Sequence, residues 1–211
     1  IAGKQTRGRG RLKRAWNTPE GNIALSVILY PDMTLLHLLI MAASLAVVHA
    51  IETVTRLKAG IKWPNDVLIS RKKCAGILLQ TLHENANAAV VVGVGINVHR
   101  GSVPQGMEEE AVCIDEAAHT VVPRRMILVW FLKHFQIVYS SFEHGGHKEV
   151  LESWKHHSHM WNGVPVWIEQ GADRRTAVTR GIDDSGALLV ETEEGAIETI
   201  LSGSVRVRRA G

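Results

Sequence analysis

The sequence has few cysteines, little net charge and no long uninterrupted apolar run. Its two cysteines, Cys74 and Cys113, provide neither a disulfide framework nor the paired spacing of a zinc site. So few cysteines are typical of the reducing cytoplasm, and the first residues do not have the pattern of a signal peptide. We therefore expect a cytoplasmic chain without a disulfide framework.

The longest apolar run covers residues 35–51, and three polar side chains, His37, Ser44 and His49, interrupt it. It falls short of the ~20 apolar residues that span a bilayer. We predict a buried amphipathic helix here and no contact with a membrane.

The histidines do not suggest a metal site either. Five of them lie between residues 144 and 159, but no pair has acidic or cysteine partners at the spacing of a zinc signature. We predict no metal site at these histidines and assign no metal-ligating residue from this pattern. The sequence also shows no Ser-His-Asp or Cys-His arrangement for nucleophilic catalysis.

Positive charge is concentrated in one segment. The chain has a net charge of +3, and residues 7–14 alone carry five cations in the order Arg-Gly-Arg-Gly-Arg-Leu-Lys-Arg. A protein that coats nucleic acid usually spreads its charge along a face. Glycine allows close backbone approach to a ligand, and arginine fits phosphate or carboxylate. The segment therefore predicts a loop that closes over a small anion, with Trp16 as a flat face for a base. A flexible RNA-binding tail is the alternative.

Apolar patterning predicts alternating strands and helices in the first 160 residues. Strands are expected at 23–30, 61–63, 67–70, 74–82 and 88–98, and helices from about 32 to 58, at 123–143 and at 148–159. Gly60 is expected to end the first helix. This order indicates helices layered on a sheet, in an α/β or α+β fold.

From residue 162 the pattern changes to short β segments separated by glycine-rich turns. Five of them are expected, at 164–169, 176–182, 187–192, 196–201 and 205–208, which suggests a small barrel. We place two domains at residues 1–160 and 161–211.

The pentapeptide Lys62-Trp63-Pro64-Asn65-Asp66 puts a lysine at the end of a strand, before a rigid turn. Such a lysine can act as a point charge on a phosphate or a substrate carboxylate. Asp66 is then a candidate to hold a metal or to orient Lys62. An exposed lysine at an ordinary strand-to-turn junction is the alternative.

The segment Gly93-Val94-Gly95-Ile96-Asn97 is similar to a truncated dinucleotide fingerprint, but it lacks the third glycine. Glycines within a strand more often permit close approach by another group. We therefore expect another group to approach these glycines closely, with Asn97 at the strand end placed to contact a ligand.

Taken in order, these motifs resemble the biotin protein ligase family over essentially the whole chain. The family carries a Gly-Arg-Gly-Arg loop followed by Arg-x-Trp, then Lys-Trp-Pro-Asn-Asp, a basic turn before Ala-Gly-Ile-Leu, and Gly-x-Gly-Ile-Asn. The matching segments here are 8–11, 14–16, 62–66, 73–78 and 93–97, together with 181–189 in the C-terminal part.

The resemblance implies an α+β fold: a mixed β-sheet with flanking helices, the class II synthetase-like catalytic fold of biotin and lipoate ligases, plus a C-terminal SH3-like β-barrel. It implies that biotin and Mg²⁺-ATP form biotinyl-5′-AMP, which a lysine of a biotin carboxyl carrier domain then attacks. The near relatives that use lipoate or octanoate are the alternative.

The resemblance also assigns roles to single residues. Lys62 and Arg11 would be catalytic, with Lys62 bridging the biotin carboxylate and the α-phosphate. The residues implied to contact biotin are Gln5, Arg9, Gly10, Arg11, Lys62 and Gly76. Those implied to contact the nucleotide are Arg11, Trp16, Asn65 and Asn97.

The sequence departs from the family at a few positions. Arg7 stands where a small residue is usual, and Lys13 where glycine is common, so we expect slower closure of the loop. The chain begins within or just after the strand ahead of the loop, so we expect the N-terminal part of the catalytic domain to be missing. No winged helix precedes the loop, so no DNA partner is expected. The family often forms homodimers, and the resemblance leaves a homodimer open here.

Overall fold

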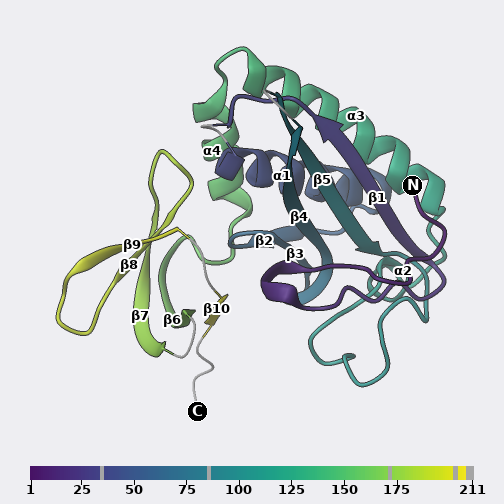
Figure 1. Cartoon of the computed structure of the whole chain (residues 1–211). Helices are drawn as coiled ribbons and strands as arrows, with labels where there is room; N and C mark the ends of the chain where they lie inside the picture. The colour runs from purple at the N-terminus through teal and green to yellow at the C-terminus, as the bar shows by residue number, and fades with distance from the viewer. Residues whose placement is uncertain (34–35, 85–86, 171–172, 202–203, 208–211) are drawn as a thin grey trace.

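The computed structural model of the chain describes residues 1–33, 36–84, 87–170, 173–201 and 204–207. Its first part is built on a five-stranded sheet in the order β1-β5-β4-β3-β2, with every neighbouring pair antiparallel (Figure 1). The strands are β1 (Asn22–Leu29), β2 (Ala59–Lys62), β3 (Asp66–Ile69), β4 (Lys72–Glu84) and β5 (Asn87–Asn97).

Parallel pairing is confined, in the described part, to two isolated bridges at the sheet margin. These are Ile61 with Ser158 and Lys73 with Ala111. The predicted strands are present, and the hairpin of β3 and β4 turns at Ser70 and Arg71, which both have positive φ. This is an α+β arrangement, as predicted.

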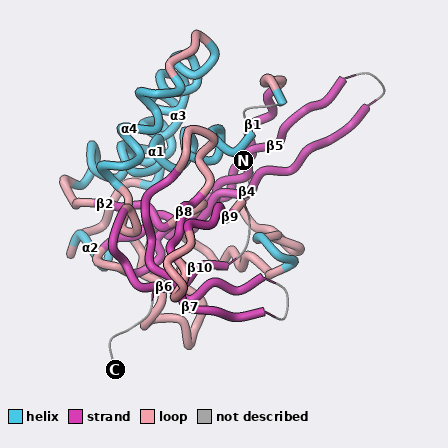
Figure 2. Tube along the Cα trace, turned by 90° about the vertical axis from the view of Figure 1, so that its left-hand side faces the viewer, coloured by secondary structure: helices cyan, strands magenta, loops and turns pink. Residues whose placement is uncertain are grey.

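The helices gather on one side of this sheet (Figure 2). They are α1 (Leu36–Thr55), α2 (Ile114–Ala118), α3 (Arg124–Glu143) and α4 (His147–His157). Helix α1 packs against the sheet and against α3 and α4. Its long, apolar sequence would suffice to cross a bilayer, with a mean hydropathy of 1.8, but 67% of that stretch is buried inside the protein.

Two predictions about α1 are wrong. The predicted burial is confirmed, but every residue from Met41 to Val48 is buried, so the central part of the helix is enclosed on all sides rather than amphipathic. It also ends before Gly60, because Arg56, the residue after Thr55, has a positive φ of 62°. The Thr55 hydroxyl donates to the Ile51 carbonyl at 2.7 Å and accepts the Leu57 N–H at 3.1 Å. Gly60 instead lies within β2, where a Cβ would collide with the His159 ring.

The C-terminal part is a second five-stranded antiparallel sheet, in the order β10-β6-β7-β8-β9. Its strands are β6 (Asn162–Gln170), β7 (Asp173–Ile182), β8 (Leu188–Glu191), β9 (Ile197–Ile200) and β10 (Ser204–Val207). They match the five predicted β segments and form a small β domain. The domain boundary between residues 160 and 161 stays a prediction.

Candidate active site

Residues 8–16 fold back on themselves as a small hairpin, which we call the Gly-Arg hairpin. The Trp16 N–H donates to the Gly8 carbonyl at 3.0 Å, and the Gly10 N–H donates to the Arg14 carbonyl at 2.8 Å. A Cβ on Gly8 would collide with the Trp16 carbonyl, so the closure of the hairpin requires glycine there. The hairpin lies along the lower ends of β3 and β4 in Figure 1.

Trp16 lies on a floor made by two glycines. Gly76 of β4 and Gly95 of β5 are direct partners in the sheet register. A Cβ on Gly95 would overlap the Trp16 indole, and one on Gly76 would lie 3.3 Å from its ring. The prediction that a group closely approaches the 93–97 glycines is therefore met by the chain's own tryptophan.

Arg11 joins the hairpin to the 62–66 pentapeptide. Its Nη1 donates to Asn65 Oδ1 at 3.0 Å. Asn65 is itself fixed to β4, because its Nδ2 donates to the Ile77 carbonyl at 2.8 Å and its carbonyl accepts the Ile77 N–H at 3.0 Å. Burial lowers the pKa of Arg11, and the nearby Asp66 carboxylate opposes that shift. Arginine nevertheless stays charged in proteins, so a half-buried cation is held at this position.

Asp66 pairs with a lysine that the sequence analysis did not select. Lys73 Nζ lies 2.7 Å from Asp66 Oδ1 and 5.3 Å from the centroid of the Trp16 ring. Lys62 is the direct strand partner of Asp66 at the end of β2 and is half-buried. The site therefore places the cations of Lys73 and Arg11 near the Asp66 carboxylate, with Lys62 opposite Asp66 in the sheet register. This concentration of positive charge suits an anionic ligand.

The remaining predicted residues lie around this core. Gln5 is at the base of the hairpin, where its Oε1 would be 2.9 Å from a Cβ on Gly8. Arg9 is exposed and bridges to Ala15 across the hairpin, next to Gly10. Asn97 ends β5, two residues beyond Gly95, and is only 4% exposed. Their contacts with ligands stay predictions.

Lys73 was missed as a site residue although it lies in the basic turn that the sequence analysis quoted. Its side chain reaches Asp66 because the β3–β4 register shifts between Val67 and Leu68. A bulge of this kind leaves no reliable mark in the sequence, so the only signal was a positive charge three residues before Gly76.

Two clefts of about 420 Å³ each lie elsewhere, and both are bordered by His99 and Arg124. None of the predicted site residues lines them. The His99 ring contacts the buried Asp115 carboxylate at 3.1 Å.

Comparisons with known proteins show which family the chain resembles. Residues 1–97 match the Biotin/lipoate A/B protein ligase family, and residues 163–208 match the Biotin protein ligase C terminal domain. A Bifunctional ligase/repressor BirA from Bacillus spizizenii is 34% identical, covering 98% of this chain and 65% of the relative. The chain thus spans about two thirds of the length of the first relatives that it matches.

Another relative is matched over most of its length. A Biotin--[acetyl-CoA-carboxylase] ligase from Paracoccus denitrificans is 30% identical, with 92% of this chain and 84% of the relative covered. A biotin protein ligase from Aquifex aeolicus, solved in complex with biotin and ATP, has a TM-score of 0.86 and 32% identity. That match covers 99% of this chain and 87% of the other. The chain belongs to the biotin protein ligase family.

Proposed function

We propose that the chain is an ATP-dependent ligase that joins biotin to a lysine of a biotin carboxyl carrier domain. The observation that carries the proposal is a group of cations on neighbouring segments: Arg11 is bonded to Asn65, Lys73 is paired with Asp66, and Lys62 lies opposite Asp66 in the sheet register. The names of the Paracoccus denitrificans relative and of the Aquifex aeolicus complex support biotin, ATP and a carboxylase carrier.

The first step brings two anions together. A biotin carboxylate oxygen attacks the α-phosphorus of ATP. The bond between the α-phosphorus and the oxygen that bridges it to the β-phosphorus breaks, and pyrophosphate leaves. Two charges ~4 Å apart repel by about 1 kcal/mol in water and by more in a dry site. Lys62 and Arg11 offset this repulsion by placing fixed positive charge beside both groups.

The other site residues position the two substrates. We assign Gln5, Arg9, Gly10 and Gly76 to biotin, and Trp16, Asn65 and Asn97 to the nucleotide. Mg²⁺ would enter with ATP and neutralise charge on its phosphates. In the second step the neutral carrier amine attacks the acyl carbon of the mixed anhydride, an amide forms, and AMP and a proton leave.

The proposal also covers the location of the enzyme, its assembly and the alternative functions. We propose a cytoplasmic homodimer that does not use a membrane as a partner. The alternative of an RNA-binding tail is not favoured, because Arg11 is half-buried and bonded to Asn65. A lipoate or octanoate ligase is less favoured, because residues 163–208 match a domain described for biotin protein ligases.

The test is the exchange of labelled pyrophosphate into ATP by the chain. We expect exchange that depends on biotin, with no response to lipoate or octanoate. Exchange with lipoate but not with biotin would overturn the substrate, and no exchange with any of the three acids would overturn the activity.

A further inference from the structure

The turn between β7 and β8, residues 183–187, reaches out of the C-terminal sheet and into the first part of the protein. Gly186 lies at its tip with φ +84°, and a Cβ there would be 2.6 Å from Met41 Sδ and 3.3 Å from Leu38 Cδ2. Both of these side chains belong to α1 and are buried. The turn therefore fits against α1 only with glycine at this position.

The turn has a shape fixed by its own residues. Asp183 Oδ1 accepts three hydrogen bonds, from the Ser185 N–H at 2.8 Å, the Ser185 hydroxyl at 2.6 Å and the Ala187 N–H at 3.0 Å. The Asp183 N–H also donates to the Ala187 carbonyl at 3.0 Å. A turn with this many internal bonds presents its backbone carbonyls in fixed directions.

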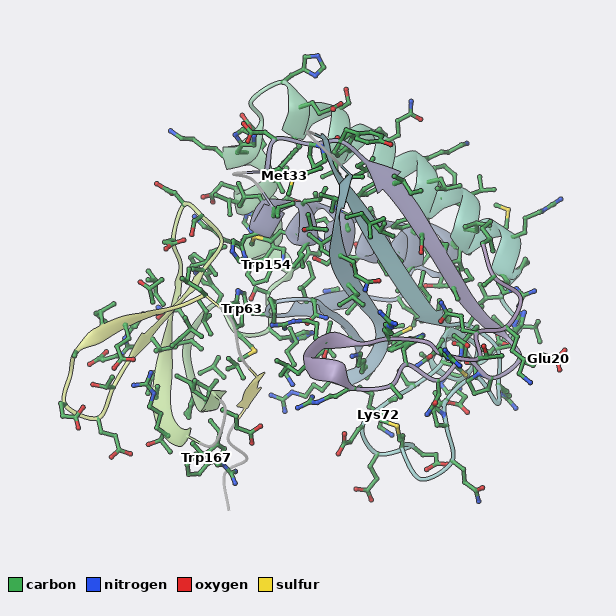
Figure 3. The ribbon with its side chains drawn as sticks, in the orientation of Figure 1. Glu20, Met33, Trp63, Lys72, Trp154 and Trp167 are labelled. Atoms are coloured by element: carbon green, nitrogen blue, oxygen red, sulfur yellow. The ribbon has the colours of Figure 1, made fainter. Side chains whose placement is uncertain are left out.

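One of those carbonyls holds the tryptophan of the 62–66 pentapeptide. Trp63 Nε1 donates to the Gly186 carbonyl at 3.0 Å, and Trp63 is only 3% exposed. Figure 3 labels Trp63 where the two parts of the protein meet. A buried indole N–H is costly when it has no acceptor, so this contact defines where the ring sits.

The same pentapeptide begins at the last residue of β2, and a later segment of the chain pairs with the outer edge of this strand. Strand β2 ends the first sheet, and the segment after α4 pairs with it. The His159 N–H donates to the Ile61 carbonyl at 2.9 Å, beside the parallel bridge of Ile61 and Ser158. Lys62 is thus flanked by two residues, Ile61 and Trp63, that are both fixed by later parts of the chain.

We propose that the β7–β8 turn is a positioning element for the reaction, acting through Trp63 on its neighbours Lys62 and Asn65. The inference rests on the proposed function of that site. Trp63 directly follows Lys62, and Asn65, the partner of Arg11, is two residues further on. Because so few bonds separate them, a shift of the indole moves the backbone that carries the lysine. Gly186 and Trp63 contact no substrate and act only through these residues.

The first experiment removes the indole donor while keeping an aromatic ring. In the 211-residue chain, Trp63→Phe leaves the Gly186 carbonyl without its donor. The matched control is Trp154→Phe, because Trp154 is a fully buried tryptophan of α4 whose Nε1 has no partner among the described residues. Both variants lose similar volume, but only Trp63→Phe loses a hydrogen bond to the turn.

Biotin affinity is measured by calorimetry, which also reports the fraction of competent sites, so partial unfolding does not imitate a change in affinity. We expect Trp63→Phe to weaken biotin binding about 10-fold, since a displacement of about 1 Å at a site can cost up to ~10²-fold. Trp154→Phe is expected to retain wild-type affinity in its folded fraction.

A double-substitution cycle with Lys62→Ala then separates positioning from general stability. If Trp63 acts through Lys62, Trp63→Phe changes affinity less than about twofold once the lysine is gone. An equal effect in both backgrounds, or no effect in either, would overturn the inference while leaving the wild-type activity in place. Wild-type protein that neither binds biotin nor exchanges pyrophosphate would overturn the proposed function, and this inference with it.

Discussion

Arg11 and Asn65, which are 54 positions apart in the sequence, are joined by a hydrogen bond of 3.0 Å from Nη1 to Oδ1. This contact links the Gly-Arg hairpin to the 62–66 pentapeptide, and Asn65 passes the link to β4 through Ile77. The two most informative motifs of the sequence therefore form one structural unit, and the guanidinium of Arg11 is held in place before any ligand arrives.

Arg11→Ala is expected to lower the kcat/KM of biotin-dependent pyrophosphate exchange by about 10- to 100-fold, as expected for losing one charge-assisted interaction of about 1.5–3 kcal/mol. Arg11→Lys should fall between, because it keeps the charge and loses the planar fork. The control is Arg125→Ala, an exposed arginine of α3 outside the site. Equal losses of kcat/KM for Arg11→Ala and Arg125→Ala would show that activity depends on the overall positive charge of the protein and not on the position of Arg11.

The two glycines of β5 give opposite expectations for the same substitution. Gly95→Ala places a Cβ inside the Trp16 indole, whereas a Cβ on Gly93 would lie 3.4 Å from the Leu78 carbonyl oxygen and 3.9 Å from Leu78 Cβ, which are ordinary contacts. Gly95→Ala should therefore place a methyl group on the surface that the proposed ligand needs and abolish measurable biotin-dependent exchange, and Gly93→Ala should retain activity within a fewfold. Circular dichroism checks that both remain folded. An active Gly95→Ala enzyme would mean that the site tolerates a side chain at position 95.

Patterning predicted the strands well because apolar runs bounded by turn residues carry a local signal, as in β1 and β5. The prediction that Gly60 ends α1 was wrong, although glycine often ends helices. The helix ends earlier, where the Thr55 hydroxyl bonds to the Ile51 carbonyl, and Gly60 packs against His159 instead. Helix α1 is buried by packing against α3 and α4. A local sequence pattern does not predict where those two helices lie.

The candidate site was predicted in outline and missed in detail. The Gly-Arg loop and the pentapeptide were each selected for their charge, and they do meet. The stacking of Trp16 on Gly76 and Gly95 depends on strand register, which a single sequence does not specify. The same is true of Trp63 and Gly186, which lie 123 positions apart.

Trp16 covers the floor on which the proposed ligand would lie, and its Nε1 is buried without an acceptor among the described residues. We expect biotin to displace the indole and so change the intrinsic fluorescence. The change should disappear in Trp16→Phe and persist in Trp154→Phe, which removes a tryptophan outside the site. A ligand response that is identical in wild type and Trp16→Phe would show that the indole does not move.

Stability should fall in mild acid because of histidines packed between the helices. The His49 ring on α1 contacts His134 of α3 and His157 of α4, each at 5.4 Å between centroids. Burial lowers the pKa of His49 below 6.5, His157 and His134 lower it further, and Glu52 opposes the shift. Burial also lowers the pKa of His134.

The unfolded chain therefore binds more protons than the folded one once the pH drops below about 6.5, and unfolding is favoured there. The contribution is intact above that pH and is lost as the pH falls toward the folded-state pKa values. We expect Tm to drop between about pH 7.5 and about pH 5.5, and to drop less in His49→Gln, which cannot be protonated. His144→Gln, at an exposed histidine just after α3, should keep the wild-type drop. An equal drop in all three proteins would mean that the histidines between α1, α3 and α4 do not control the acid response.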